Sequence, residues 1–107
     1  MFHKSFDVVT FGSGAVDIFI HGSIPEMNKN LVLPIGSKNT IHDIQYHVGG
    51  GGINSAVAFA RFGYKTGFMG KIGRDYFGKK ILKCIHKEKI LFLGEKSNEE
   101  SGVSLII

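Results

Sequence analysis

The chain of 107 residues is long enough for one domain with a modest core and too short for two. Its hydrophobic fraction of 43% and charged fraction of 21% are ordinary for a globular protein, and it has no run of about 18 apolar residues that could span a membrane. The net charge of +4 comes largely from the lysine-rich segment 79–89, where no aromatic residues interleave with the lysines, so the pattern favours a solvated helix face over nucleic-acid binding.

The first predicted element is a buried strand over residues 6–11 (FDVVTF). After two glycines the apolar run resumes at 15–20 (AVDIFI), with Asp17 as its only charge. A buried carboxylate is unfavourable unless it is paired or hydrogen-bonded, so Asp17 is a candidate ligand-binding residue. A salt bridge from Asp17 to a distant lysine is the alternative.

Residues 21–39 are rich in turn formers, and residues 40–48 (TIHDIQYHV) partly alternate apolar and polar side chains. That period predicts a strand with one wet face, in a separate half-exposed sheet. His42 and His47 fall on this strand, where solvent-facing positions are favoured over a binding role. None of the five histidines has zinc-ligand spacing, so no metal site is predicted.

Four consecutive glycines, 49–52, precede a predicted helix whose apolar stripe begins at Ile53 and which Gly63 would end. The dinucleotide fingerprint fails because GSGAVD at 12–17 has an acid in place of the third glycine, and a P-loop fails because Lys71 is not followed by Ser or Thr. Two alternatives stay open. The glycine amides and Asn54 could line a pocket for a hydroxyl-rich ligand, or they could form a tight turn that Asn54 caps.

The rest of the chain predicts a strand at 65–73, a second helix that Asp75 caps, a short apolar run at 90–93, a turn at 94–101 and a strand at 102–107. The single cysteine, Cys84, belongs to the inner stripe of the second helix and is expected to be a small core residue in a reducing compartment. Because the start of the chain does not have the pattern of a signal peptide, we expect a cytoplasmic protein. The order of elements predicts an α/β domain with a small accessory sheet, in which two helices cannot cover both faces of a parallel sheet.

The stretch 49–73, GGGGINSAVAFARFGYKTGFMGKIG, resembles the N-terminal signature of the pfkB, or ribokinase-like, family of carbohydrate kinases. GRDYFG at 73–78, Asp17 upstream and SGVSLII at the end extend the resemblance over nearly the whole chain. It implies a ribokinase-like three-layer α/β fold with helices on both faces, incomplete here, plus a small β-sheet lid. Residues 1–107 would be the N-terminal part of a single kinase domain, with lid strands at about 18–48 and 102–107.

The resemblance further implies transfer of the γ-phosphate of ATP to a sugar hydroxyl, with Asp17, Gly50, Gly51 and Asn54 as substrate contacts. The catalytic base and the sites for ATP and Mg²⁺ would lie beyond Ile107, so the chain alone is expected to be inactive. The resemblance also implies a homodimer that forms through the lid. Nucleoside phosphorylation, or a sugar- or nucleoside-binding module without catalysis, remains an alternative.

Three positions depart from the family pattern. Ribokinases have Lys at the position of Gly51 and Asn at the position of Ala15, so ribose and fructose phosphates are disfavoured as substrates. The family usually turns with a glycine where this chain has Lys89, so no glycine marks the end of the second helix.

Overall fold

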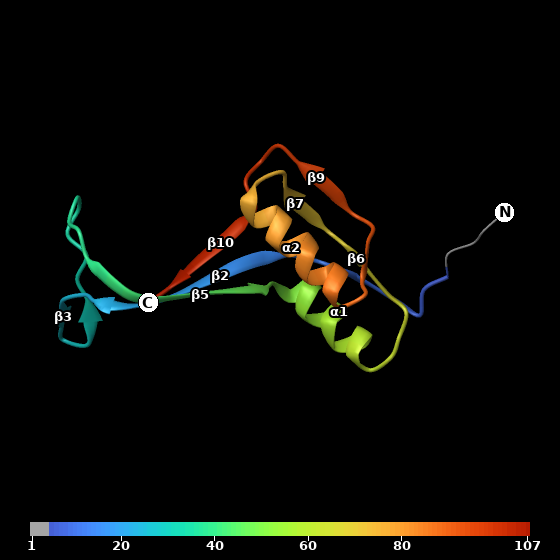
Figure 1. Cartoon of the computed structure of the whole chain (residues 1–107), viewed down its shortest axis with the longest axis horizontal. Helices are drawn as coiled ribbons and strands as arrows, with labels where there is room; N and C mark the ends of the chain where they lie inside the picture. Colours follow the sequence, from blue (N-terminus) through green and yellow to red (C-terminus); the bar gives the residue numbers. More distant parts are fainter. Residues whose placement is uncertain (1–4) are drawn as a thin grey trace.

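A computed structural model describes residues 5–107. The strands are β1 Val8–Phe11, β2 Ala15–Ser23, β3 Glu26–Met27, β4 Asn30–Leu31, β5 Thr40–Gly49, β6 Thr66–Met69, β7 Lys71–Gly73, β8 Leu91–Phe92, β9 Glu95–Ser97 and β10 Gly102–Ile106; the helices are α1 Gly51–Arg61 and α2 Tyr76–Lys87. Figure 1 shows the two helices together at one end of an elongated molecule and the β3–β4 hairpin at the other.

One three-stranded sheet, in the order β1-β6-β8, is parallel throughout. Helix α1 packs against β1 and β6, and α2 packs against β7, β8 and β2. Thr10 on β1 donates a hydrogen bond to the carbonyl oxygen of Gly52 (2.8 Å), which joins the sheet to the start of α1. The core is apolar and consists of Val16, Ile53, Ala56, Phe68, Ile72, Ile81, Ile85 and Ile90.

The opposite face of this sheet has no helix over it within residues 5–107. Val9 and Phe11 on β1 and Met69 on β6 share that face by register, and their side chains are exposed, Phe11 by 82%. The prediction of a buried first strand is therefore wrong for this part of the chain, because β1 is covered on one face only. Both helices lie on the same side of the sheet, in agreement with the prediction that two helices cannot cover both faces.

The second three-stranded sheet, β10-β2-β5, is separate from the first, as the alternating pattern of residues 40–48 predicted. We call it the outer sheet. Strand β2 is antiparallel to β5 and parallel to β10, and the outer sheet extends from the helices toward the distal hairpin (Figure 1). Strands β1 and β10 are edge strands in this part of the molecule.

The helix ends follow the sequence closely. The carboxylate of Asp75 accepts a hydrogen bond from the backbone N–H of Gly78 (2.8 Å) and caps α2, and Gly63 (φ 94°) ends α1. Helix α2 ends in a Schellman arrangement, with Lys89 in the left-handed region (φ 60°) and the N–H of Ile90 bonded to the carbonyl of Ile85 (2.8 Å). The lysine thus adopts the conformation that a glycine normally supplies.

Two strand predictions differ from the structure. The single strand expected at 65–73 is divided at Gly70 into β6 and β7, which belong to different sheets. A Cβ on Gly70 would lie 2.6 Å from the carbonyl oxygen of Gly12, so the chain bends where it passes the backbone after β1. The segment expected to be only a turn, 94–101, contains β9, which pairs with β7.

Candidate functional site

The adjacent glycines at the start of α1 are needed for different reasons. Gly50 has φ 98°, and a Cβ on it would lie 2.6 Å from the carbonyl oxygen of Ser13, so the turn itself requires glycine at this position. A Cβ on Gly52 would lie 2.7 Å from the ring of Phe68. A Cβ on Gly51 would meet no atom within 4 Å. Packing therefore explains Gly50 and Gly52 but gives no reason for a glycine at position 51.

The first amides of α1 already have partners. The N–H of Gly51 donates to the hydroxyl of Ser13 (3.2 Å), and the N–H groups of Gly52 and Ile53 donate to the carbonyl of Ser13 (3.0 and 3.3 Å). These three amides are therefore not free to line a pocket, which contradicts the amide part of the ligand-pocket hypothesis and leaves its other members, the bare backbone at Gly51 and the side chain of Asn54. The alternative, a tight turn that Asn54 caps, is wrong about the cap. Asn54 makes no capping hydrogen bond and lies inside α1 with an exposed side chain.

Asp17 and Asn54 approach the same space from different elements. The Cβ position of Gly49, at the end of β5, lies 2.9 Å from Oδ2 of Asp17 and 3.9 Å from Oδ1 of Asn54. Any side chain at position 49 would fill this space. Asp17 comes from β2 and Asn54 from α1, so the turn between β5 and α1 brings together two groups that are far apart in sequence.

The carboxylate of Asp17 is half-buried and has no hydrogen-bond or ion-pair partner among residues 5–107. The ion pair found in this part of the chain, Arg61 to Glu88, lies elsewhere and lowers the pKa of Glu88 through its hydrogen bond. The alternative of a salt bridge to a distant lysine is therefore not realised within the described residues. An acceptor without a partner is available for a ligand.

An open hollow of about 360 Å³ begins at Asp17 and runs along the outer sheet. Its lining comes from alternate positions of two paired strands: Asp17, Phe19 and His21 on β2, and Gln45 and His47 on β5. The rings of Phe19 and His47 meet edge to face at 5.2 Å between centroids. The sequence pattern favoured a solvent-facing position for His47, and its side chain is exposed. The strand period put it on one face, but only the register shows that this face also carries Asp17.

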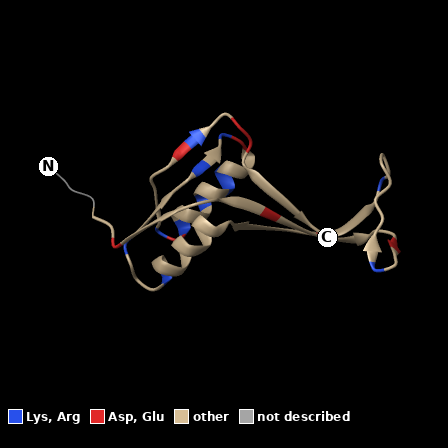
Figure 2. Cartoon of the chain, turned by 180° about the vertical axis from the view of Figure 1, so that it is seen from behind, with Lys and Arg blue, Asp and Glu red and all other residues tan. Residues whose placement is uncertain are grey.

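His42, the other histidine of this strand, does not line the hollow. Its ring is hydrogen-bonded to the hydroxyl of Ser23 (2.9 Å). Strands β2, β5 and β10 carry no lysine or arginine, whereas Figure 2 shows lysines gathered on α2. The hollow thus combines hydrogen-bonding groups with the phenyl ring of Phe19, a lining suited to a polar, hydroxyl-bearing ligand.

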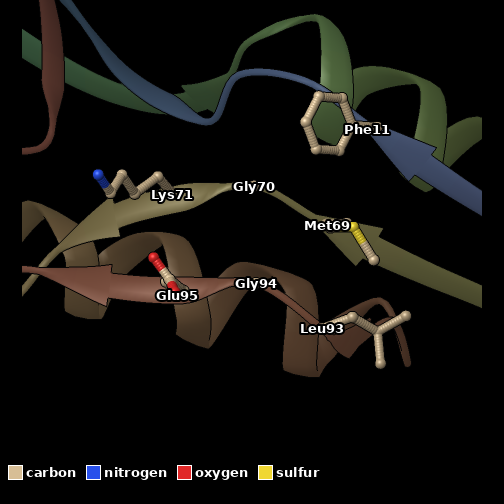
Figure 3. Close-up of a pocket in the computed structure, with 7 residues that line it drawn as sticks. All are labelled: Phe11, Met69, Gly70, Lys71, Leu93, Gly94 and Glu95. Carbon is tan, nitrogen blue, oxygen red and sulfur yellow. The ribbon is translucent and has the colours of Figure 1, made fainter.

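A second hollow, of about 310 Å³, lies beyond the carboxyl ends of β1 and β6. Figure 3 shows Phe11, Met69 and Leu93 toward one end of it and Lys71 and Glu95 toward the other. None of the residues that the sequence singled out as substrate contacts lines it. Its apolar end continues the sheet face that neither helix covers.

Asp75 has a structural task outside the first hollow. Its two oxygens accept hydrogen bonds from the N–H and the hydroxyl of Ser101, both at 2.8 Å, in addition to the N–H of Gly78. These bonds, the one from the Ser101 N–H foremost, hold the pKa of Asp75 below its ordinary value. They fasten the start of β10 to the start of α2, so the outer sheet and the helices are held together at this point.

No group of three or more His, Cys, Asp or Glu side chains in the described part of the chain is arranged to hold a metal ion. No helix over the same residues is long and apolar enough to cross a membrane. The candidate site in this part of the chain is the space beside Gly49, where Asp17 and Asn54 meet, together with the hollow that begins at Asp17. Gly50, Gly51 and Asn54 do not line that hollow.

Comparison with known proteins confirms the family that the sequence resembles. Residues 22–107 match the family model described as "pfkB family carbohydrate kinase". A 5-dehydro-2-deoxygluconokinase from Clostridium perfringens is 33% identical over 105 residues, which cover 95% of this chain and 27% of the relative. The chain therefore spans about a quarter of the length of this curated relative.

Solved structures share the fold. A fructokinase from Xylella fastidiosa with bound ATP superposes with a TM-score of 0.69 at 19% identity, over 92% of this chain and 28% of that one. A ribokinase from Cryptococcus neoformans in complex with ADP gives a TM-score of 0.68 at 24% identity, over 92% and 29%. The arrangement of two sheets and two helices is thus that of the ribokinase-like fold, over a part of its length.

Proposed function

The chain belongs to the pfkB family of carbohydrate kinases, and on that premise we propose that residues 1–107 bind the sugar substrate of an ATP-dependent carbohydrate kinase. They form the N-terminal part of one kinase domain. The outer sheet, β10-β2-β5, acts as a lid that covers the bound sugar. The complete reaction transfers the γ-phosphate of ATP to a sugar hydroxyl.

The observation that carries the proposal is the convergence of Asp17 and Asn54 on the space beside Gly49. A half-buried carboxylate without a partner among residues 5–107 is an acceptor that a sugar hydroxyl can satisfy, in a charge-assisted hydrogen bond. The amide of Asn54 offers both a donor and an acceptor to a neighbouring hydroxyl. Two such groups at one small space match a polyol better than they match an apolar ligand.

The glycines have distinct parts in this proposal. Gly51 keeps the start of α1 bare, so that the sugar can approach the main chain where a side chain would otherwise project into open space. Gly50 shapes the turn that sets Gly51 and Asn54 in place. In such kinases ATP supplies the phosphoryl group and Mg²⁺ neutralises its charge. The described residues offer no cluster of ligands for the metal ion. These residues bind and orient the sugar.

Asp17→Asn tests the proposal in the complete polypeptide that contains these residues. Loss of one charge-assisted hydrogen bond, about 1.5 to 3 kcal/mol, should lower kcat/KM roughly 10- to 150-fold. The assay is sugar-dependent ADP release over D-glucose, D-fructose, D-gluconate, 5-dehydro-2-deoxy-D-gluconate and adenosine. Glu26→Gln, which removes a charge from the exposed hairpin strand β3, is the matched control and should leave kinetics unchanged.

Three outcomes would count against the proposal. Kinetics of Asp17→Asn within twofold of the wild type, with the fold intact, would remove Asp17 from the site. Turnover of adenosine alone would indicate a nucleoside kinase. Calorimetric binding of a sugar without ADP release under any condition would indicate a binding module that lacks catalysis.

A further inference from the structure

Three polar side chains form a hydrogen-bonded series along β5. Asp43, Gln45 and His47 lie at alternate positions and therefore on one face of the outer sheet. The amide nitrogen Nε2 of Gln45 donates to Oδ2 of Asp43 (3.2 Å), and Nε2 of His47 lies 3.4 Å from Oε1 of Gln45. The hydroxyl-bearing ligand of the proposed function would meet the last member of this series.

The chemistry of the series determines where the protons lie. An ionised carboxylate can only accept, so Gln45 must present its NH₂ to Asp43 and its oxygen to His47. That oxygen is also only an acceptor, so Nε2 of His47 carries the hydrogen. In the neutral imidazole the other nitrogen, Nδ1, then holds a free lone pair and acts as an acceptor. With Nε2 bonded to Gln45, Nδ1 is the ring nitrogen of His47 that is left to accept a hydrogen bond from a ligand.

This acceptor lies beside the acceptor that is already part of the site. His47 is the direct cross-strand partner of Asp17, and both residues line the same hollow. Side chains in such pairs start about 4.5 to 5.5 Å apart at Cβ. No hydrogen bond joins Asp17 to His47, and the strands of the outer sheet carry no lysine or arginine that would compete for either group. Two acceptors side by side call for a ligand that brings two donors side by side.

We propose that His47 is a second hydroxyl-binding residue that determines substrate specificity: adjacent hydroxyls of a sugar donate one hydrogen bond to Asp17 and one to Nδ1 of His47. The ring of Phe19, edge-on to His47, supplies an apolar wall along the C–H face of the same sugar. This inference rests on the proposed function and narrows it, because it requires a substrate with a vicinal diol. Gln45 is a positioning residue, which acts by keeping the hydrogen of His47 on Nε2.

The test uses His47→Phe in the complete polypeptide, with His42→Phe as the matched control on the same strand. His42 is exposed, is bonded to Ser23 and lies outside the hollow, so the control makes the same chemical change away from the ligand. Loss of one neutral hydrogen bond should raise KM roughly 2- to 12-fold with little change in kcat. His47→Gln, which retains an acceptor oxygen, should recover part of the loss, and His42→Phe should leave KM unchanged.

Deoxy sugars make the test specific to one hydroxyl. The probes are D-glucose, D-fructose and D-gluconate, each with its monodeoxy analogues. One analogue of the preferred sugar should have a higher KM than the parent sugar with the wild type. The factor of this increase should equal the factor by which His47→Phe raises the KM of the parent sugar. The variant should show no further loss with that analogue, because the contact is already absent.

The outcomes separate the two proposals. If these sugars are phosphorylated and the KM of His47→Phe equals the KM of His42→Phe, the role of His47 is overturned and the kinase assignment stays in place. The role of His47 would also be overturned if every deoxy analogue raised KM by the same factor in His47→Phe as in the wild type. Absence of phosphorylation with every sugar of both panels, 5-dehydro-2-deoxy-D-gluconate included, would refute the proposed function, and the role of His47 with it.

Discussion

Gly51→Val separates a glycine that the ligand needs from a glycine that the fold needs. A Cβ at position 51 meets nothing within 4 Å, and the residue is the first of α1, with no positive φ. Valine is slightly better than glycine in a helix, by about 0.4 kcal/mol at an interior position, and less at the first turn. The free energy of unfolding should therefore change by no more than about 0.5 kcal/mol, which shifts Tm by only a few degrees.

Sugar binding should respond quite differently to this substitution. The valine side chain would stand in the open space beside Asn54, where the proposed substrate approaches the main chain. We expect the sugar's Kd to rise at least about 10-fold, which corresponds to about 1.4 kcal/mol. Isothermal titration calorimetry of the complete polypeptide measures the Kd, and differential scanning calorimetry of the same sample measures Tm.

Gly50→Ala is the contrasting variant at the neighbouring position. Its Cβ would lie 2.6 Å from the carbonyl oxygen of Ser13, at φ 98°, so the substitution should destabilise the fold by at least about 1 to 2 kcal/mol. A Gly51→Val protein with normal affinity and a large drop in Tm would refute the reasoning, because it would make position 51 part of a tight turn like position 50.

The remaining predictions concern stability and the chain alone. Lys89→Gly should raise the free energy of unfolding by about 1 kcal/mol in urea denaturation, since it removes an L-residue from φ 60°; an unchanged midpoint would contradict the observed helix end. Because the pKa of Asp75 is lower in the folded than in the unfolded chain, the unfolded state binds more protons in acid. Its stabilising effect should be complete above about pH 4 and be lost as pH falls below it, and Asp75→Asn should melt lower at pH 7 with a flatter acid profile. Residues 1–107 alone should release no ADP with any sugar and should associate through the open edges of β1 and β10; a cooperatively melting monomer with sugar-dependent ADP release would contradict this.

Local features were readable because their causes lie within a few residues. The apolar stripe that begins at Ile53 predicts α1, and the left-handed glycine at 63 predicts its end. Asp75 predicts the start of α2 in the same way. The family resemblance likewise rests on spacing along the chain, which is why residues 49–73 were sufficient to indicate a pfkB-like kinase.

The roles of individual site residues depended on distances that no local pattern contains. In the sequence the glycines at 50 and 51 look alike. In the structure Gly50 lies against Ser13, whereas a Cβ on Gly51 would meet nothing within 4 Å. Only the packing of the β1–β2 turn distinguishes the two positions. The register of β2 against β5 places His47 opposite Asp17, and a shift of one residue would have placed it on the other face. The division of residues 65–73 at Gly70 depends on the backbone after β1, which lies more than fifty residues earlier in the chain. The sequence alone determined the two helices, the end of α1, the start of α2 and the family that the chain resembles. The tertiary structure decided which side chains meet, because those contacts depend on how distant segments pack together.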